Sequence, residues 1–135
     1  MPKTPLDVFV SSSRRDAELA AKIEHELRKL GVAAWTASEV VSAGDDWRRS
    51  VKTAIRDTDC FLLVVGSPDA ASTGWTSYEL GMAEALGKRI FLLLSHKYSP
   101  AQLPADLSGV PIIPFDPAHP ELAAREVSER LLAAA

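Results

Sequence analysis

Cys60-Phe61-Leu62-Leu63-Val64-Val65 is an uninterrupted apolar run near the middle of the chain, and Gly66-Ser67-Pro68-Asp69 follows it directly. A short apolar run that ends in turn-forming residues is typical of a strand covered on both faces. Such strands lie inside parallel sheets, because the crossover helices pack against both faces of the sheet. The run therefore predicts an α/β protein with this strand near the centre of its sheet.

Strand-like and helix-like segments alternate on both sides of this run. The other expected strands span residues 7–11, 32–35, 89–94 and 110–114, and the expected helices span 15–30, 45–58, 76–86 and 118–134. Alternation of this kind gives a parallel sheet with helices on both faces. We therefore expect a flavodoxin-like sheet of five parallel strands in the order 2-1-3-4-5, within a single domain over residues 1–135. Pro111 and Pro114 place the last strand at an edge of the sheet, because proline donates no backbone hydrogen bond.

The composition and charge argue against several kinds of partner. The chain of 135 residues has a net charge of −3 with both signs mixed along it, so no basic patch for nucleic acid or an acidic membrane surface is expected. No apolar stretch approaches the roughly 20 residues of a membrane span, and the N-terminus lacks the apolar segment of a signal peptide. The only cysteine, Cys60, is expected to be a buried, reduced thiol. These features together predict a cytoplasmic protein that binds neither nucleic acid nor membrane.

The sequence predicts neither a metal site nor a bound cofactor. His25, His96 and His119 are far apart and lack metal-ligand spacing, so we expect them at the surface or in loops. The glycines are scattered along the chain and form no phosphate-binding loop.

The expected topology locates a ligand crevice without help from any motif. In this strand order the winding reverses between the strands at 7–11 and 60–65, and ligands bind at the carboxyl ends of such strands. Those ends are followed by Ser11–Arg14 and Gly66–Asp69.

Glu79 is the strongest candidate for a functional residue beside this crevice. It follows Trp75 by four residues, so the two side chains share a helix face that apolar neighbours direct inward or into a cleft. A carboxylate above the carboxyl edge of the sheet can meet a ligand directly. The local sequence also allows a structural role, because Thr76-Ser77-Tyr78-Glu79 fits a capping box with Thr76 as the N-cap. Trp75, likewise, is of a type that often only covers the edge of a core.

Five segments in register resemble the TIR domain family over essentially the whole chain. They are Asp7-Val8-Phe9-Val10-Ser11 followed by Asp16, Leu27 with Gly31-Val32, Gly44-Asp45-Asp46-Trp47 followed by Ala54-Ile55, Phe61 to Ser67, and Trp75-Thr76-Ser77-Tyr78-Glu79-Leu80. The last segment resembles the family's Trp-x-x-x-Glu signature. Many TIR domains, particularly in prokaryotes, use this glutamate to cleave NAD at the nicotinamide–ribose bond. The resemblance therefore implies an NAD+ glycohydrolase or cyclase, with Glu79 catalytic and with nicotinamide and ADP-ribose, or a cyclic isomer, as products.

The same resemblance implies a set of substrate-binding residues. They are Ser13, Arg14, Trp47, Ser67 and Trp75. Ser13 and Arg14 would contact ribose or phosphates, Trp47 would flank the nicotinamide, and Trp75 would line the pocket or support the catalytic carboxylate. Arg14 could instead be an ordinary solvated arginine, and Trp47 could be the core anchor of its helix.

The resemblance also implies a role in prokaryotic antiviral defence, gated by self-association or by contact with other TIR domains. Two alternatives stay open. One is a non-catalytic module that binds other TIR domains. The other is an enzyme of a different class, because Glu79-Leu80-Gly81-Met82-Ala83 with Gly87-Lys88 also resembles nucleoside 2-deoxyribosyltransferases. The three functions differ in whether NAD or a deoxynucleoside is turned over, or neither.

Overall fold

The central apolar run forms a strand, as expected, in a computed structural model that describes residues 7–36, 47–66, 74–103, 107 and 109–133. The strands are β1 (Asp7–Ser12), β2 (Ala33–Thr36), β3 (Cys60–Val65), β4 (Arg89–Ser95) and β5 (Ile112–Phe115). The helices are α1 (Ala17–Lys29), α3 (Trp47–Asp57), α4 (Gly74–Ala85) and α5 (Pro120–Ala133), with short 3₁₀ turns η1 (Arg14–Asp16) and η3 (Pro100–Gln102). Each expected strand and helix is therefore present, with shifts only at the ends.

The strands pair in the order β2-β1-β3-β4-β5, and every pair is parallel. This confirms the flavodoxin-like topology expected from the sequence. Ser11 pairs with Leu63 in the register between β1 and β3, so these two strands end side by side. The proline-containing β5 pairs with β4 alone among the described strands and lies at an edge, as predicted.

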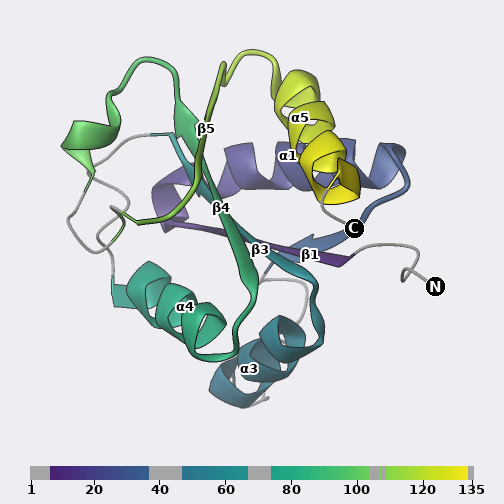
Figure 1. Cartoon of the computed structure of the whole chain (residues 1–135), viewed down its shortest axis with the longest axis vertical. Helices are drawn as coiled ribbons and strands as arrows, with labels where there is room; N and C mark the ends of the chain where they lie inside the picture. The colour runs from purple at the N-terminus through teal and green to yellow at the C-terminus, as the bar shows by residue number, and fades with distance from the viewer. Residues whose placement is uncertain (1–6, 37–46, 67–73, 104–106, 108, 134–135) are drawn as a thin grey trace.

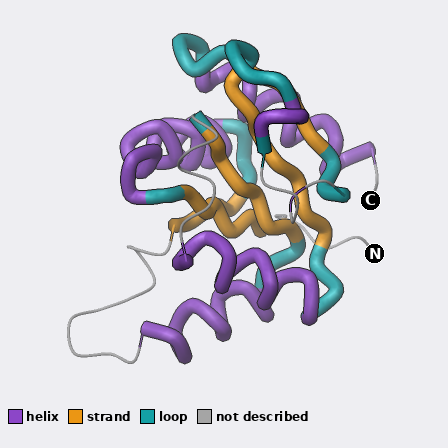
Figure 2. The backbone as a smooth tube through the Cα atoms, turned by 90° about the vertical axis from the view of Figure 1, so that its left-hand side faces the viewer, coloured by secondary structure: helices purple, strands orange, loops and turns teal. Residues whose placement is uncertain are grey.

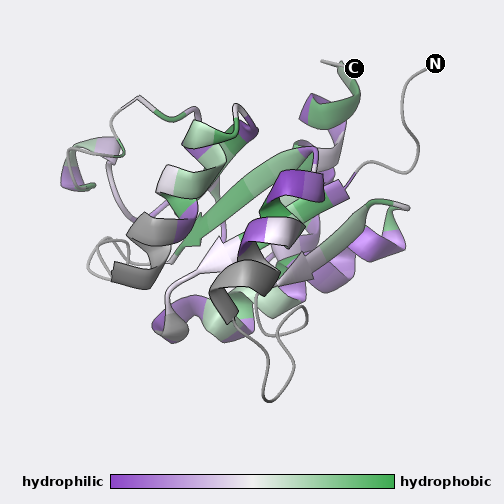
Figure 3. Cartoon of the chain, turned by 90° about the horizontal axis from the view of Figure 1, so that it is seen from below, coloured by the Kyte–Doolittle hydropathy of each residue, from purple (hydrophilic) through white to green (hydrophobic). Residues whose placement is uncertain are grey.

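Helices cover both faces of the sheet. Figure 1 shows α1 and α5 on one side and α3 and α4 on the other, and the side view in Figure 2 agrees. Alternation along β1 divides the core accordingly, since Val8 and Val10 pack with α1 and α5 while Phe9 packs with α3 and α4. All of β3 is buried, including Cys60, which confirms the expectation of a buried thiol. Figure 3 shows green, hydrophobic strands inside and helices that carry both colours.

Three leucines, two on α5 and one at the end of α1, are exposed. Leu122, Leu132 and Leu30 are 52%, 62% and 47% exposed. Ala123 and Ala124 are buried on α5 instead, beside Val127 and Leu131. Small side chains at this position let α5 approach α1 closely, so the contact face lies on the alanines.

The three histidines of the chain lie at the surface, as the sequence predicted. His25, His96 and His119 are exposed, and the last two lie near acidic side chains at the surface. Among the described residues no group of three or more ligand-type side chains could hold a metal ion. Within the same residues, no helix combines the length and the apolar character needed to cross a bilayer.

Candidate active site

Glu79 lies on α4, which packs across β1, β3 and β4. The side chain is fully buried, at 0% exposure, and its Oε1 accepts a hydrogen bond from the Ser11 hydroxyl of β1. The two residues are 68 positions apart in the chain, and the topology brings them together where β1 ends. The glutamate singled out from the sequence therefore meets the carboxyl edge of the sheet.

Glu79 does not take the capping role that the local sequence allowed as an alternative. α4 begins at Gly74, so Thr76 lies inside the helix and Glu79 is beyond its first turn. The carboxylate reaches across to a strand instead of back to the helix start. Glycine is a poor helix former, so local rules start the helix after it, whereas the folded chain includes it.

The second carboxylate oxygen of Glu79 has no partner among the described residues. This atom, Oε2, is buried and makes no hydrogen bond. Burial raises the pKa of the Glu79 carboxyl to about 7, and the Ser11 hydrogen bond acts in the opposite direction. A buried polar atom without a partner destabilises a fold, so each one needs a reason such as a ligand or a proton. Near neutral pH this carboxyl can hold either state.

Ser13 places a second buried oxygen at the same edge. Its side chain is 5% exposed, and its Oγ makes no hydrogen bond with a described residue. Its backbone is held in place, because the Ser13 carbonyl accepts from the Ser12 hydroxyl at 3.0 Å and from the Asp16 N–H at 3.1 Å. An oriented residue with an unpartnered hydroxyl is suited to meeting a ligand.

Asp16 and Gly66 join the two loops that border the predicted crevice. The Oδ2 atom of Asp16, just after β1, accepts a hydrogen bond of 3.0 Å from the N–H of Gly66, just after β3. Burial raises the pKa of the Asp16 carboxyl, against the opposing effects of the Gly66 N–H and of Arg15. The Ser13 hydroxyl interacts with the same carboxylate and has the smallest of these opposing effects. The contact fixes the spacing between the ends of β1 and β3.

The other substrate-binding candidates are described only in part. Ser67 lies outside the described residues. Arg14, Trp47 and Trp75 have described backbones, in η1, at the start of α3 and in the first turn of α4, while their side chains fall outside the description. The structure thus groups Glu79 with Ser13 at one edge and leaves these four candidates as predictions.

Sequence reasoning missed Ser11 as the partner of Glu79. The alternation of side chains along β1 could have pointed to this contact. Ser11 shares a face of the sheet with Phe9, and Phe9 packs on the α4 side. The sequence analysis named Asp16 only as part of a segment that resembles the family, and assigned it no role.

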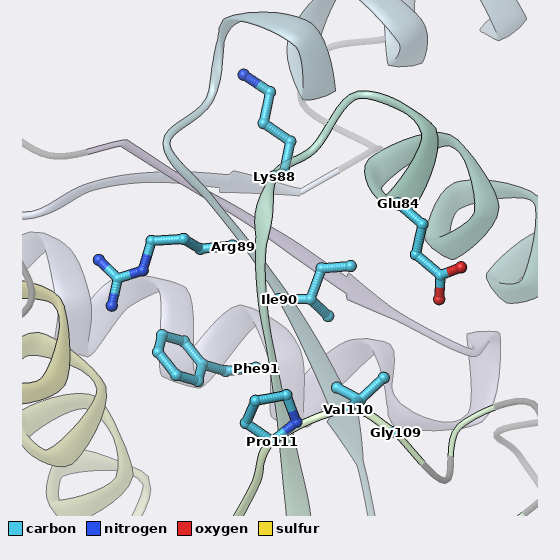
Figure 4. A pocket seen from close by; sticks show the side chains of 8 residues that line it. All are labelled: Glu84, Lys88, Arg89, Ile90, Phe91, Gly109, Val110 and Pro111. Carbon is cyan, nitrogen blue, oxygen red and sulfur yellow. The ribbon is translucent and has the colours of Figure 1, made fainter.

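A pocket of 530 Å³ lies elsewhere, at the edge of the sheet where β4 begins. Its lining residues, shown in Figure 4, are Glu84, Lys88, Arg89, Ile90, Phe91, Gly109, Val110 and Pro111. The charged groups there already have contacts, because the Lys88 ammonium donates to the Arg56 carbonyl at 2.6 Å and Arg89 lies over the Phe91 ring at 5.3 Å. In Figure 4 the side chains diverge and converge on no common point. We therefore place the candidate active site at Glu79.

Comparisons with known proteins point to the same fold. A model of the TIR domain family matches residues 8–131. The chain is 30% identical over 78 residues to the NAD(+) hydrolase TcpC of Escherichia coli O6:H1, covering 57% of this chain and 25% of that protein. It is 30% identical over 95 residues to the 2' cyclic ADP-D-ribose synthase AbTIR of Acinetobacter baumannii, covering 67% of this chain and 35% of that protein. The TIR domain of the Toll-related receptor TRR-2 of Hydra magnipapillata superposes with a TM-score of 0.69 at 19% identity, over 94% of both chains.

Proposed function

This chain belongs to the TIR domain family, and we propose that it cleaves NAD+ at the nicotinamide–ribose bond. The products are nicotinamide and either ADP-ribose or a cyclic isomer. The observation that carries the proposal is a fully buried carboxylate, Glu79, at the carboxyl edge of the sheet, with one oxygen that no described residue bonds. Two relatives, named as an NAD(+) hydrolase and a cyclic ADP-ribose synthase, support it over the shared segments.

The chemistry of the cleavage fits a single buried carboxylate. Departure of nicotinamide leaves positive charge on the ribose, and a nearby carboxylate stabilises that charge most strongly where water is excluded. Nicotinamide leaves as a neutral base, so no acid is needed to protonate it. The acid and base pair of most glycosidases is therefore not required. In this scheme the Oε2 of Glu79 faces the ribose and can hold its hydroxyls for attack.

The remaining candidates have roles in the same scheme. Ser13 hydrogen-bonds a ribose or phosphate oxygen, and Arg14 pairs with the phosphates. Trp47 flanks the nicotinamide, Trp75 lines the pocket, and Ser67 completes the binding site after β3. NAD is a substrate here, and the reaction uses no separate cofactor or metal.

In this proposal self-association regulates the activity. The protein acts in the cytoplasm, in prokaryotic antiviral defence. Under the same proposal a neighbouring TIR domain completes the site at the carboxyl edge of the sheet. Isolated domains are then weakly active, and higher protein concentration raises the rate per molecule.

The deciding experiment measures nicotinamide release from NAD+ over a series of protein concentrations. Products are resolved by mass, and Glu79→Ala is assayed in parallel after its fold has been checked by circular dichroism. We expect the wild type to release nicotinamide at a rate per molecule that rises with concentration, and Glu79→Ala to release none above background.

Each alternative predicts a different pattern in that assay. Equal rates for wild type and Glu79→Ala would remove Glu79 from the mechanism. A rate per molecule that stays constant with concentration would remove the gating by self-association. Concentration-dependent assembly without NAD turnover would favour the interaction module. Base exchange on a deoxynucleoside would favour the transferase.

Ser13→Ala tests the second buried oxygen. The Ser13 hydroxyl makes no well-formed hydrogen bond with a described residue and has only a small effect on the Asp16 carboxylate, so its removal should change the melting temperature little. In the proposed complex the hydroxyl bonds the substrate, so KM for NAD+ should rise about tenfold while kcat changes little. Steady-state kinetics and thermal melts check both parts. A lower melting temperature with an unchanged KM would show that Ser13 supports the fold alone.

A further inference from the structure

We propose that Ser11 is a positioning residue whose hydroxyl holds one oxygen of Glu79 and thereby presents the other oxygen to the substrate. The inference rests on the proposed function, in which Glu79 is the catalytic carboxylate. Ser11 touches neither substrate nor reacting atoms in this scheme, and it acts through Glu79.

The Ser11 hydroxyl is buried and bonds the Glu79 carboxylate. Ser11 is 2% exposed and lies inside β1, paired in register with Leu63 of the central strand. Its backbone position is therefore fixed by the pairing with β3. The hydroxyl donates to the Oε1 of Glu79, a residue with 0% exposure on the helix above. Two buried groups on rigid elements thus hold each other, as precise placement of a reacting group requires.

Holding one oxygen defines where the other one lies. A carboxylate is planar, so a hydrogen bond at Oε1 restricts rotation about the last side-chain bond and fixes the direction of Oε2. That second oxygen is buried and has no partner among the described residues. Without Ser11 the two oxygens could exchange places or turn away, and the fraction of time in a reactive orientation would fall.

Burial is the largest influence on the pKa of the Glu79 carboxyl, and the Ser11 hydroxyl opposes it. α4 packs against α3, β1, β3 and β4. The titratable groups whose side chains are described on those elements are Asp7, Lys52, Arg56, Asp57, Cys60 and Arg89. None of these contributes to the pKa of Glu79, which is raised by burial and lowered by the Ser11 hydroxyl. The hydrogen bond therefore favours the ionised form that the cleavage of NAD+ needs.

The consequence is a change in pH dependence that a purely structural role would not produce. Loss of the donor raises the pKa of Glu79, so more of the enzyme is protonated at neutral pH. Ser11→Ala should therefore move the acid limb of the pH–rate profile upward by about one pH unit, the size expected for one hydrogen bond to a charged group. At alkaline pH, part of the lost rate should return.

The experiment compares Ser11→Ala, Ser11→Cys and Ser11→Thr with the wild type. Thr keeps the hydroxyl, whereas Cys fills a similar volume with a weak donor. The titration of the Glu79 carboxyl is followed by carbon NMR without substrate, with the signal identified by its loss in Glu79→Gln. The pH–rate profile for NAD+ is measured on the same proteins. Thr58→Val is the control, because it removes a buried hydroxyl that bonds the Asp7 and Cys60 carbonyls at the opposite edge of the sheet.

We expect Ser11→Ala and Ser11→Cys to raise the titration midpoint and the acid limb together, and Ser11→Thr and Thr58→Val to leave both in place. An unmoved midpoint in Ser11→Ala would overturn the proposal, and so would full recovery of the wild-type rate at alkaline pH, because a carboxylate that is no longer oriented should stay slower. If even the wild type releases no nicotinamide, the proposed function fails. The titration without substrate then decides by itself whether Ser11 controls this carboxyl.

Discussion

Glu79→Gln is expected to release nicotinamide about a thousandfold more slowly than the wild type, and at about pH 8 it should also be the more stable protein. The activity is lost because the amide carries no charge to stabilise the ribose cation. The stability is gained because the wild type keeps a buried carboxylate ionised at this pH, whereas glutamine has no charge to bury. Glu79 is thus expected to be needed for catalysis while its ionised form lowers the stability of the folded protein.

The sign of the stability change follows from the pKa of Glu79. Burial raises it from the ordinary 4.5 to about 7 in the folded protein. The native state therefore binds this proton more tightly, and its stabilising contribution is fully present below pH 4.5 and disappears as the pH rises through about 7. The shift corresponds to an order-of-magnitude difference of about 3 kcal/mol between the two ends of that range.

Thermal melts at two pH values check this prediction. At about pH 8 the melting temperature of Glu79→Gln should exceed that of the wild type by roughly 5 to 10 °C, and at about pH 4.5 the difference should vanish. Glu84→Gln is the matched control, since Glu84 is an exposed residue of the same helix. A gain of equal size at both pH values would show that ionisation of Glu79 is not its cause.

The features of this fold that were predictable are those encoded in short segments. The buried run of β3, the prolines around β5 and the alternation of strands and helices each fix a local structure, and together they leave one common topology. The same topology placed the crevice where Ser13 and Glu79 carry buried oxygens without a hydrogen-bond partner in the described part of the chain.

The features that were not predictable depend on contacts between distant segments. The sequence offers Ser11, Ser12 and Ser13 in a row, and only the packing of α4 on β1 selects Ser11 as the donor to Glu79. The start of α4 was misplaced for a related reason, because the local capping signal at Thr76 was overruled by the folded structure. On α5, Ala123 and Ala124 are buried, whereas the more hydrophobic Leu122 and Leu132 are exposed.

Gly66→Ala is expected to destabilise the protein by about 2 to 3 kcal/mol. A Cβ atom at this position would lie 2.6 Å from the Oδ1 and 3.3 Å from the Cγ of Asp16. Asp16 would have to move, and its Oδ2 would lose the hydrogen bond from the Gly66 N–H. Since the Asp16 side chain is buried, its carboxylate would then keep only the weaker influences of Arg15 and Ser13. Denaturant unfolding of the variant and the wild type measures the difference.

Gly81→Ala is the matched control for that substitution. Gly81 lies inside α4, and a Cβ atom there would meet nothing within 4 Å. Alanine is the better helix former, so this variant should be more stable than the wild type by about 1 kcal/mol. The same chemical change is therefore expected to have opposite signs at two glycines of one chain.

A double-mutant cycle shows whether Asp16 is the cause of the expected loss at Gly66. Asp16→Ala removes the carboxylate and leaves room for the new methyl group, so Asp16→Ala/Gly66→Ala should be destabilised by clearly less than the sum of the two single variants. Additive effects would mean that Gly66 is constrained by something other than Asp16. Non-additive effects would locate the constraint in the one contact that joins the ends of β1 and β3. A rise in KM for NAD+ in both single variants would then connect that contact to the candidate active site.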